Sequence, residues 1–196
     1  MATKKSKSKQ WVSIMAPKFF GEVEIGKTFA TEPDYIIGRK IITNAMNVVN
    51  DLDKFYMKLI FTISSINGTK ALTEFTGSQL MSEYITRLVL RRVRRTDLVQ
   101  DLMTKDGVKV RVKSIILTSK KISTATKFDV TNMIREMIQK TVENSTLEQF
   151  VEDVISDEIK MKVLQEARKI YPVRYFELRR TEVIKQTSSE PKQQKD

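Results

Sequence analysis

The order of hydrophobic patterns in this chain of 196 residues predicts an α+β fold: a mainly antiparallel, barrel-like sheet with one inserted helix and a C-terminal helical segment. Residues 11–120 are rich in alternating apolar and polar positions, which is the period of a β-strand. From 121 to 171 the apolar residues recur at helical spacing, and 173–184 alternates again as a closing strand. Because strands and helices do not alternate one by one, we expect antiparallel pairing rather than a parallel α/β sheet.

The strands of the first part are bounded by recognisable turns. The run from 55 to 63 places Met57, Leu59 and Phe61 on one face of a strand. The pairs Asn67-Gly68 and Asp106-Gly107 each lie between alternating hydrophobic runs, and such pairs favour the backbone of a tight hairpin turn. The predicted strands are therefore 40–49, 55–63, 70–76, 98–104 and 108–117.

Between the two hairpins the apolar period changes to that of a helix. From Ser78 onward, apolar residues recur every three or four positions, which predicts an amphipathic helix. A second face carries a charged residue every fourth position, at Glu83, Arg87, Arg91 and Arg95, and would form a basic stripe. Val93 and the residues after it fit either the end of this helix or the start of a strand.

Three further helices are predicted in the later third of the chain. One covers 130–142, where apolar residues follow helical spacing. A second is opened by a capping box at Ser145 and Glu148, because this spacing lets the two side chains bond to each other's backbone amides. A third runs from 158 to 170 and stops before Pro172, since a residue that precedes proline avoids the helical conformation.

The chain is predicted to form a single RNA-binding domain over 11–184, between a basic flexible tail at 1–10 and a second flexible tail at 185–196. No long linker rich in Gly, Ser or Pro interrupts this domain. In the whole chain, 35 lysines and arginines outnumber 24 aspartates and glutamates, so the net charge is +11, while 40% of the residues are hydrophobic. A folded protein with this excess of positive charge attracts polyanions, and nucleic acid is the commonest polyanion in a cell.

The composition excludes several classes of chemistry. The chain contains no Cys and no His, so it has no thiolate nucleophile, imidazole base, disulfide or Cys/His zinc site. It also lacks the glycine motifs that bind dinucleotides and phosphates, so no catalytic residues, metal ligands or cofactors are expected. No run approaches 18 apolar residues, and the lysine-rich start lacks the apolar stretch of a signal peptide. We therefore expect a cytoplasmic protein with no membrane partner.

Clustered cations are the candidate RNA-binding residues. Five arginines fall within nine positions from 87 to 95, and a guanidinium group can hold a phosphate with two hydrogen bonds. Lys109, Arg111 and Lys113 alternate along a predicted strand, so they should project from one face of the sheet. The predicted RNA-binding residues are Lys4, Lys5, Lys7, Lys9, Arg39, Arg87, Arg91, Arg92, Arg94, Arg95, Lys109, Arg111, Lys113, Lys120, Lys121, Arg179 and Arg180.

Each cluster has an ordinary alternative. The arginines could form a solvated helix face paired with Glu83 and Asp97, and the strand cations could lie on an ordinary exposed sheet face. Trp11, next to the lysine-rich start, is either a core residue or a surface on which bases stack. The segment from Thr141 to Glu158 contains six acids and no base, so we expect it to face solvent or a basic neighbouring protein rather than RNA.

A series of short motifs carries a resemblance to a known family. The motifs are Trp11-Val-Ser-Ile-Met-Ala-Pro17, Ile25-Gly-Lys-Thr28, Gly38-Arg39, Phe75-Thr-Gly77, Arg91-Arg92, Thr104-Lys-Asp-Gly107, Ile134-Arg-Glu-Met137 and Tyr171-Pro172. In this order they resemble the small-subunit ribosomal protein family shared by archaea and eukaryotes and called e-S-one or S-three-A-e, in its shorter archaeal form. The resemblance implies a non-enzymatic constituent of the small ribosomal subunit, bound to ribosomal RNA on the platform near the messenger exit side. Its partners would be small-subunit ribosomal RNA, neighbouring ribosomal proteins and messenger RNA near the exit.

Two other functions stay open at this point. A free RNA-binding protein or RNA chaperone that works outside the ribosome would have the same composition. A Mg²⁺-dependent nuclease would need carboxylate ligands, for which Asp97, Asp101 and Asp106 are the candidates. Ordinary loop and surface carboxylates are the commoner explanation of these three residues.

Overall fold

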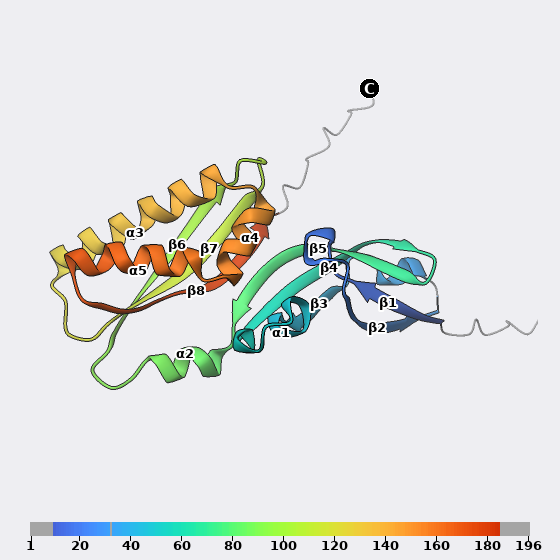
Figure 1. Ribbon diagram of the computed structural model, residues 1–196, viewed down its shortest axis with the longest axis horizontal. Coiled ribbons are helices and arrows are strands. Elements are labelled where there is room, and N and C mark those ends of the chain that lie inside the picture. The colour runs from blue at the N-terminus through green and yellow to red at the C-terminus, as the bar shows by residue number, and fades with distance from the viewer. Residues whose placement is uncertain (1–9, 32, 185–196) are drawn as a thin grey trace, which may run out of the picture.

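The computed structural model describes residues 10–31 and 33–184 of the chain (Figure 1). Its strands are β1 (Gln10–Met15), β2 (Glu24–Ala30), β3 (Lys40–Asn44), β4 (Met57–Asn67), β5 (Lys70–Leu80), β6 (Arg94–Met103), β7 (Lys109–Thr118) and β8 (Val173–Ile184). Its α-helices are α1 (Ala45–Val49), α2 (Ser82–Leu88), α3 (Thr124–Asn144), α4 (Leu147–Ile155) and α5 (Glu158–Ile170). Short 3₁₀ turns are η1 (Lys18–Phe20), η2 (Pro33–Ile36) and η3 (Leu52–Lys54).

The eight strands form one sheet that branches at β5. β5 pairs antiparallel with β4, and β4 pairs with β3 on its other side. The start of β5, residues 70–72, also pairs in parallel with β1, and the end of β5, residues 77–79, pairs antiparallel with β8. β2 extends the first branch, and β7 and β6 extend the second, all antiparallel. The predicted α+β class, the mainly antiparallel sheet and the C-terminal helical segment are confirmed.

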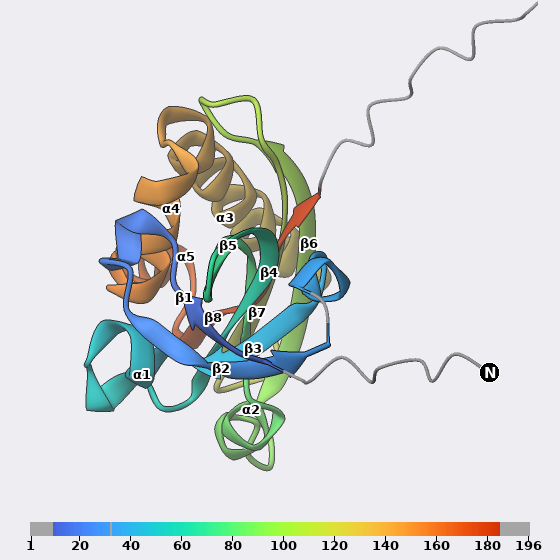
Figure 2. The same ribbon diagram turned by 90° about the vertical axis from the view of Figure 1, so that its right-hand side faces the viewer.

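The branching divides the elements into two lobes (Figures 1 and 2). The first lobe contains β1–β5 and α1, and its strands curl around a small core of Val12, Ile14, Ile36, Ile63 and Ala71. The second lobe contains β6–β8, with α3 and α5 packed along one face of these strands. None of the described helices is long and apolar enough to cross a membrane.

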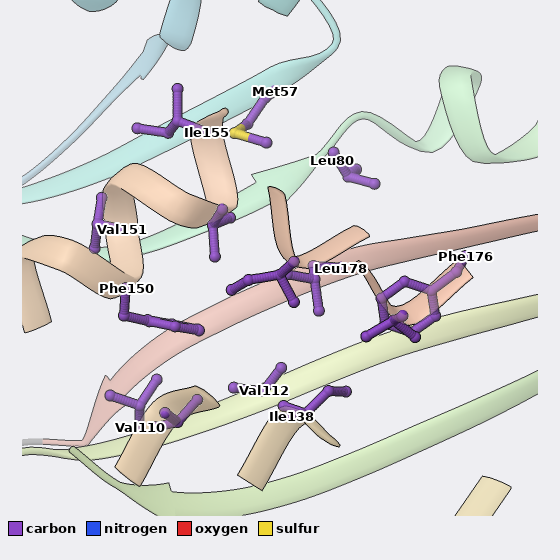
Figure 3. Packing of buried hydrophobic residues seen from close by; sticks show 14 of the residues in the cluster. Met57, Leu80, Val110, Val112, Ile138, Phe150, Val151, Ile155, Phe176 and Leu178 are labelled. Atoms are coloured by element: carbon purple, nitrogen blue, oxygen red, sulfur yellow. The ribbon is translucent and has the colours of Figure 1, made fainter. Parts of the chain in front are cut away.

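A larger core joins the two lobes through α4, which lies between them. Phe150 and Ile155 of α4 belong to the same buried cluster as Met57 of β4, Leu80 of β5 and Leu178 of β8 (Figure 3). Phe150 is only 1% exposed, and burying a side chain of this size contributes about 2–3 kcal/mol to stability. The two lobes therefore share this larger core, beside the small core of the first lobe.

The pairing of β8 with β5 depends on a glycine. A Cβ atom on Gly77 would lie 2.3 Å from the carbonyl oxygen of Thr181, well inside any allowed contact. Next to it, the hydroxyls of Ser78 and Thr181 are 2.7 Å apart, and the Thr181 hydroxyl also accepts a hydrogen bond from the Ser78 amide. Both of these side chains are buried, so the hydrogen bonds offset the cost of removing the two hydroxyl groups from water. β8 can approach β5 closely enough to pair because residue 77 has no side chain.

A buried polar network adds a second connection between the lobes. Asp157, just before α5, accepts a hydrogen bond from Lys54 of the first lobe. Glu177 of β8 accepts a hydrogen bond from the Tyr84 hydroxyl of α2 at 3.0 Å and forms a 2.7 Å ion pair with Lys160 of α5. Burial raises the pKa of the Glu177 carboxyl, and the hydrogen bond to Lys160 opposes that rise. These contacts hold α2 and α5 against the strands where the lobes meet.

Both predicted hairpins are confirmed, but several element ends differ from the predictions. The strand predicted at 40–49 ends at Asn44, because α1 begins with the buried Ala45. β4 begins at Met57 rather than at Phe55, which is 54% exposed. The helix predicted from Ser78 begins only at 82, because residues 78–80 continue the pairing of β5 with β4.

The capping box of α4 and the environment of Trp11 also differ. The box is formed by Thr146 and Gln149, each side chain accepting a hydrogen bond from the other's backbone amide. The prediction was one residue early, because the Ser145 hydroxyl instead donates to the Thr141 carbonyl at the end of α3. Trp11 is 65% exposed and packs edge-on against an aromatic ring of β2, so it is not a core residue.

Candidate nucleic-acid interface

The connection between α2 and β6 presents two arginines at the surface. α2 ends at Leu88, and the chain then turns at 90–93, where the Val93 amide donates a hydrogen bond to the Leu90 carbonyl at 3.1 Å. Arg91 and Arg92 lie in this turn and are exposed. Arg92 has a φ of 71°, in the left-handed region that costs a residue with a side chain about 1–2 kcal/mol. Strain of this kind persists where the surrounding structure holds it, which marks Arg92 as a candidate functional residue.

The connection between β7 and α3 presents two lysines. Lys120 and Lys121 are exposed in the segment that leads from β7 to the helix. The Thr118 hydroxyl donates a hydrogen bond to the Lys120 carbonyl at 3.1 Å, and the Tyr171 hydroxyl donates to the Lys121 carbonyl at 3.2 Å. The backbone of both lysines is therefore anchored while their side chains extend into solvent.

Strand pairing brings these two connections together. Arg94, the first residue of β6, is the register partner of Thr118, the last residue of β7. A depression of about 540 Å³ lies where the connections meet. We call it the basic pocket, and it is lined by Arg92, Val93, Arg94, Ser119, Lys120 and Lys121. Among the described residues that line it there are four cations and no carboxylate, so the local potential is strongly positive.

The predicted basic stripe along one helix is wrong beyond Arg87. Because α2 ends at 88, Arg91 lies in the turn and Arg95 lies on β6. The Asp97 carboxylate accepts two hydrogen bonds from Arg95, at 2.9 and 3.0 Å, so the charge of this arginine is partly compensated. The cause lies in the tertiary structure, because residues 94–103 form a strand by pairing with β7. A strand was one of the two alternatives that the sequence allowed for Val93 and the residues after it.

The cations of β7 share one face of the sheet, as their alternation predicts, but carboxylates of neighbouring strands meet them there. Arg111 donates two hydrogen bonds to Asp101 of β6, at 2.6 and 2.8 Å. Lys113 lies 3.1 Å from Glu182 of β8. The hydrogen bond from Arg111 lowers the pKa of Asp101. Part of the positive charge of this face is therefore compensated across the strands, which the spacing along one strand does not reveal.

The remaining predicted cations are not brought to the basic pocket. Arg39 lies in the first lobe, where it donates a hydrogen bond to the Thr28 hydroxyl at 2.8 Å. Arg180 forms a 2.6 Å ion pair with Glu182. Arg179 lies at a register shift between β7 and β8: Lys113 pairs with Arg180 and Ser114 with Leu178, so Arg179 has no register partner on β7. The predictions for Lys4, Lys5, Lys7 and Lys9 lie outside the described residues.

The acidic segment lies at the opposite end of the second lobe. β6 starts beside the basic pocket and runs for 10 residues, which spans about 30 Å, to the turn that leads into β7. At this turn Asp106 accepts a hydrogen bond from the Leu147 amide, the first residue of α4, at 2.9 Å. Glu148 and Glu152 of α4 are exposed there. The basic pocket and the exposed carboxylates of α4 thus lie toward opposite ends of β6, and the β6–β7 turn also carries the exposed Lys105.

The three aspartates considered as Mg²⁺ ligands have separate partners. Asp97 accepts hydrogen bonds from Arg95, Asp101 from Arg111, and Asp106 from a helix amide. Within residues 10–31 and 33–184, no group of three or more acidic residues is placed so that it could hold a metal ion. The nuclease alternative therefore has no assembled site in the described part of the chain.

The fold and the basic pocket define a small basic α+β protein in which four cations gather at one end of the sheet. The family model described as the Ribosomal S3Ae family matches residues 2–187. The small ribosomal subunit protein eS1 of Desulfurococcus amylolyticus is 37% identical over 180 residues, which cover 92% of this chain and 84% of the relative. The proteins of the same name from Methanopyrus kandleri and Saccharolobus islandicus are 34% and 35% identical, covering 97% and 92% of this chain and 92% and 87% of the relatives. The chain therefore belongs to the Ribosomal S3Ae family, as the resemblance indicated.

Proposed function

We propose that this protein is a structural constituent of the small ribosomal subunit in the cytoplasm and binds ribosomal RNA through the basic pocket. The names of its relatives support assembly into that subunit. The observation that carries RNA as the ligand is the pairing of Arg94 with Thr118, because it gathers four cations around one depression.

The basic pocket suits the backbone of a folded RNA. A guanidinium group can hold a phosphate with two hydrogen bonds, and an ammonium group attracts one as a point charge. Two groups of each kind around one depression can therefore contact neighbouring phosphates of a single strand. Because A-form RNA hides the base edges of its deep groove, recognition would depend on backbone shape rather than on sequence.

A wider contact surface is expected around this pocket. Arg87 and Arg91 are exposed on α2 and in the turn after it, so they can extend the phosphate contacts. The lysines at 4–9 would add further phosphate contacts, and the strand cations would add weaker ones because carboxylates compensate them. By analogy with the family it resembles, the protein would lie on the platform near the messenger exit, beside other ribosomal proteins and messenger RNA. No catalytic step forms part of this proposal.

The test of the basic pocket is the salt dependence of binding to ribosomal RNA. Replacing Arg92 and Lys121 by Ala together should reduce the steepness of log K against log salt by about 1.4–1.8 units. The reason is that each phosphate contact releases counterions when it forms, so two lost contacts remove that release at two phosphates. A matched control removes Lys27 and Lys162, two exposed lysines outside the pocket, and should leave the slope nearly unchanged. Equal slopes for the wild type and the Arg92/Lys121 variant would refute the assignment of the pocket.

Sedimentation distinguishes a ribosomal constituent from a free RNA-binding protein. Tagged protein from a native lysate in Mg²⁺ buffer should migrate with small subunits in a one-to-one ratio and stay bound at high salt. Protein that remains at the top of the gradient would favour the RNA chaperone alternative. RNA cleavage that is lost in Asp97→Asn or Asp106→Asn, with binding retained, would instead identify a nuclease.

A further inference from the structure

A second hollow lies between the lobes, at the end of the second lobe opposite the basic pocket. η1 and β5 border it on the first lobe, and the β6–β7 turn and the start of α4 border it on the second; its volume is about 700 Å³. Figures 1 and 2 both place the blue turn that contains η1 beside α4. We call this the acidic hollow. Apolar side chains from both lobes line it: Phe19, Leu72, Phe75 and Leu147.

The charged residues around the acidic hollow are mostly carboxylates. The lining contains Glu22, Glu74, Asp106 and Glu148, and among the described residues Lys18 is its one cation. This local balance is the reverse of the chain as a whole, whose net charge is +11. Such a surface repels phosphates and attracts cationic groups. RNA is therefore a poor occupant of the acidic hollow.

A smaller hollow repeats this chemistry farther along α4. Its volume is about 550 Å³, and it shares Phe19 with the acidic hollow. Glu148 lines the larger hollow and Glu152 the smaller one, and residues four apart lie on the same face of a helix. Lys54, the lysine that lines the smaller hollow, is bonded to Asp157 and is thereby compensated. The same face of α4 thus presents one carboxylate to each apolar hollow.

We propose that the acidic hollow docks a lysine- or arginine-rich segment of a neighbouring protein. The apolar side chains of that segment enter beside Leu72 and Leu147, and its cations meet Glu22 and Glu148. Charge complementarity selects this occupant over RNA, and the apolar lining selects a peptide over a free cation. Residues 185–196 of the chain itself are a poorer match, because they combine three lysines with two acids and no large apolar side chain. Only the identity of the neighbour as a ribosomal protein rests on the proposed function.

A peptide-binding assay with the purified full-length protein tests the docking chemistry. The probe is a fluorescent nine-residue peptide of alternating lysine and leucine, and its binding is followed by polarisation. Reversing both Glu148 and Glu152 to Lys should weaken binding by about tenfold, and Leu72→Ser should weaken it as well. The matched control reverses Glu136 and Glu143, which are exposed on α3, and should change the affinity by less than about twofold.

The control decides between docking and a general charge effect. If both double reversals weaken binding equally, the peptide follows net charge alone and the proposal is overturned. The wild type failing to bind the peptide would overturn it as well. A loss confined to the α4 variant and to Leu72→Ser would support the acidic hollow as the binding site.

Crosslinking in assembled subunits identifies the natural occupant. A photoreactive phenylalanine analogue replaces Leu72, and the tagged protein is incorporated into small ribosomal subunits. Crosslinks to a basic segment of another protein would support the proposal, whereas crosslinks to RNA or to residues 185–196 of the same chain would overturn it. A protein that does not enter subunits counts against the proposed function, and the peptide assay still decides the docking chemistry independently.

Discussion

Gly77→Ala is expected to destabilise the protein by separating β5 from β8. The new methyl group would lie 2.3 Å from the Thr181 carbonyl oxygen, so relief requires a backbone shift of about 1 Å rather than a side-chain rotation. Overpacking of this kind costs about 1–3 kcal/mol. Loss of the two buried hydrogen bonds between Ser78 and Thr181 adds about 1 kcal/mol each. The free energy of unfolding should therefore fall by about 3–5 kcal/mol.

Urea unfolding followed by circular dichroism measures this loss, and thermal unfolding should show a decrease in Tm of about 10 °C or more. Gly26→Ala is the matched control, because it also adds one methyl group to a strand but a Cβ there meets no atom within 4 Å. The control should cost less than about 1 kcal/mol. If Gly77→Ala were no more destabilising than Gly26→Ala, the close approach of the two backbones would not limit residue 77, and the reasoning would be refuted.

Three further predictions concern charged residues. Arg95→Ala should weaken binding to ribosomal RNA, but its change in binding free energy should be less than half of that caused by the loss of one basic-pocket arginine. The reason is that Asp97 already compensates the charge of Arg95. Filter binding at two salt concentrations measures both changes. Asp106→Ala should lower the free energy of unfolding by about 1 kcal/mol, since the first amide of α4 loses its acceptor, and an unchanged urea midpoint would contradict this role. The hydrogen bond from Arg111 lowers the pKa of Asp101 in the folded state relative to the unfolded state. The ionised Asp101 carboxylate therefore stabilises the fold above the pKa of the unfolded state, and this stabilisation is lost as the pH falls through the pKa of the folded state. Thermal unfolding between pH 2 and 5 should therefore depend less on pH in Arg111→Ala than in the wild type.

Local signals made the hairpins predictable from the sequence. Gly68 and Gly107 have φ values of 60° and 75°, so each turn needs the left-handed backbone that glycine adopts without strain. Asn67 and Asp106 before them complete the turn signal. Because the signal, the turn and the two strands are all contiguous in the chain, no tertiary information was needed to find them.

The basic pocket was only half predictable, because its parts are distant in the sequence. Its four cations were all named as candidates, but their meeting depends on the register that pairs Arg94 with Thr118. The helical spacing of the arginines was misleading for the same reason, since the strand partner decides the conformation of residues 94–103. The compensation of Arg111 by Asp101 also arises across strands, where no spacing within one strand can reveal it.

The branch point at β5 imposes an order on folding during synthesis. Ser78 and its partner Thr181 are 103 residues apart, and at common rates of translation roughly 5–20 s pass between the two. During that interval the first lobe is complete in sequence, yet the end of β5 has no β8 to pair with. An open strand end of this kind invites association with other nascent chains. We therefore expect the nascent chain to depend on early capture by a chaperone or by its assembly partners until its final strand is made.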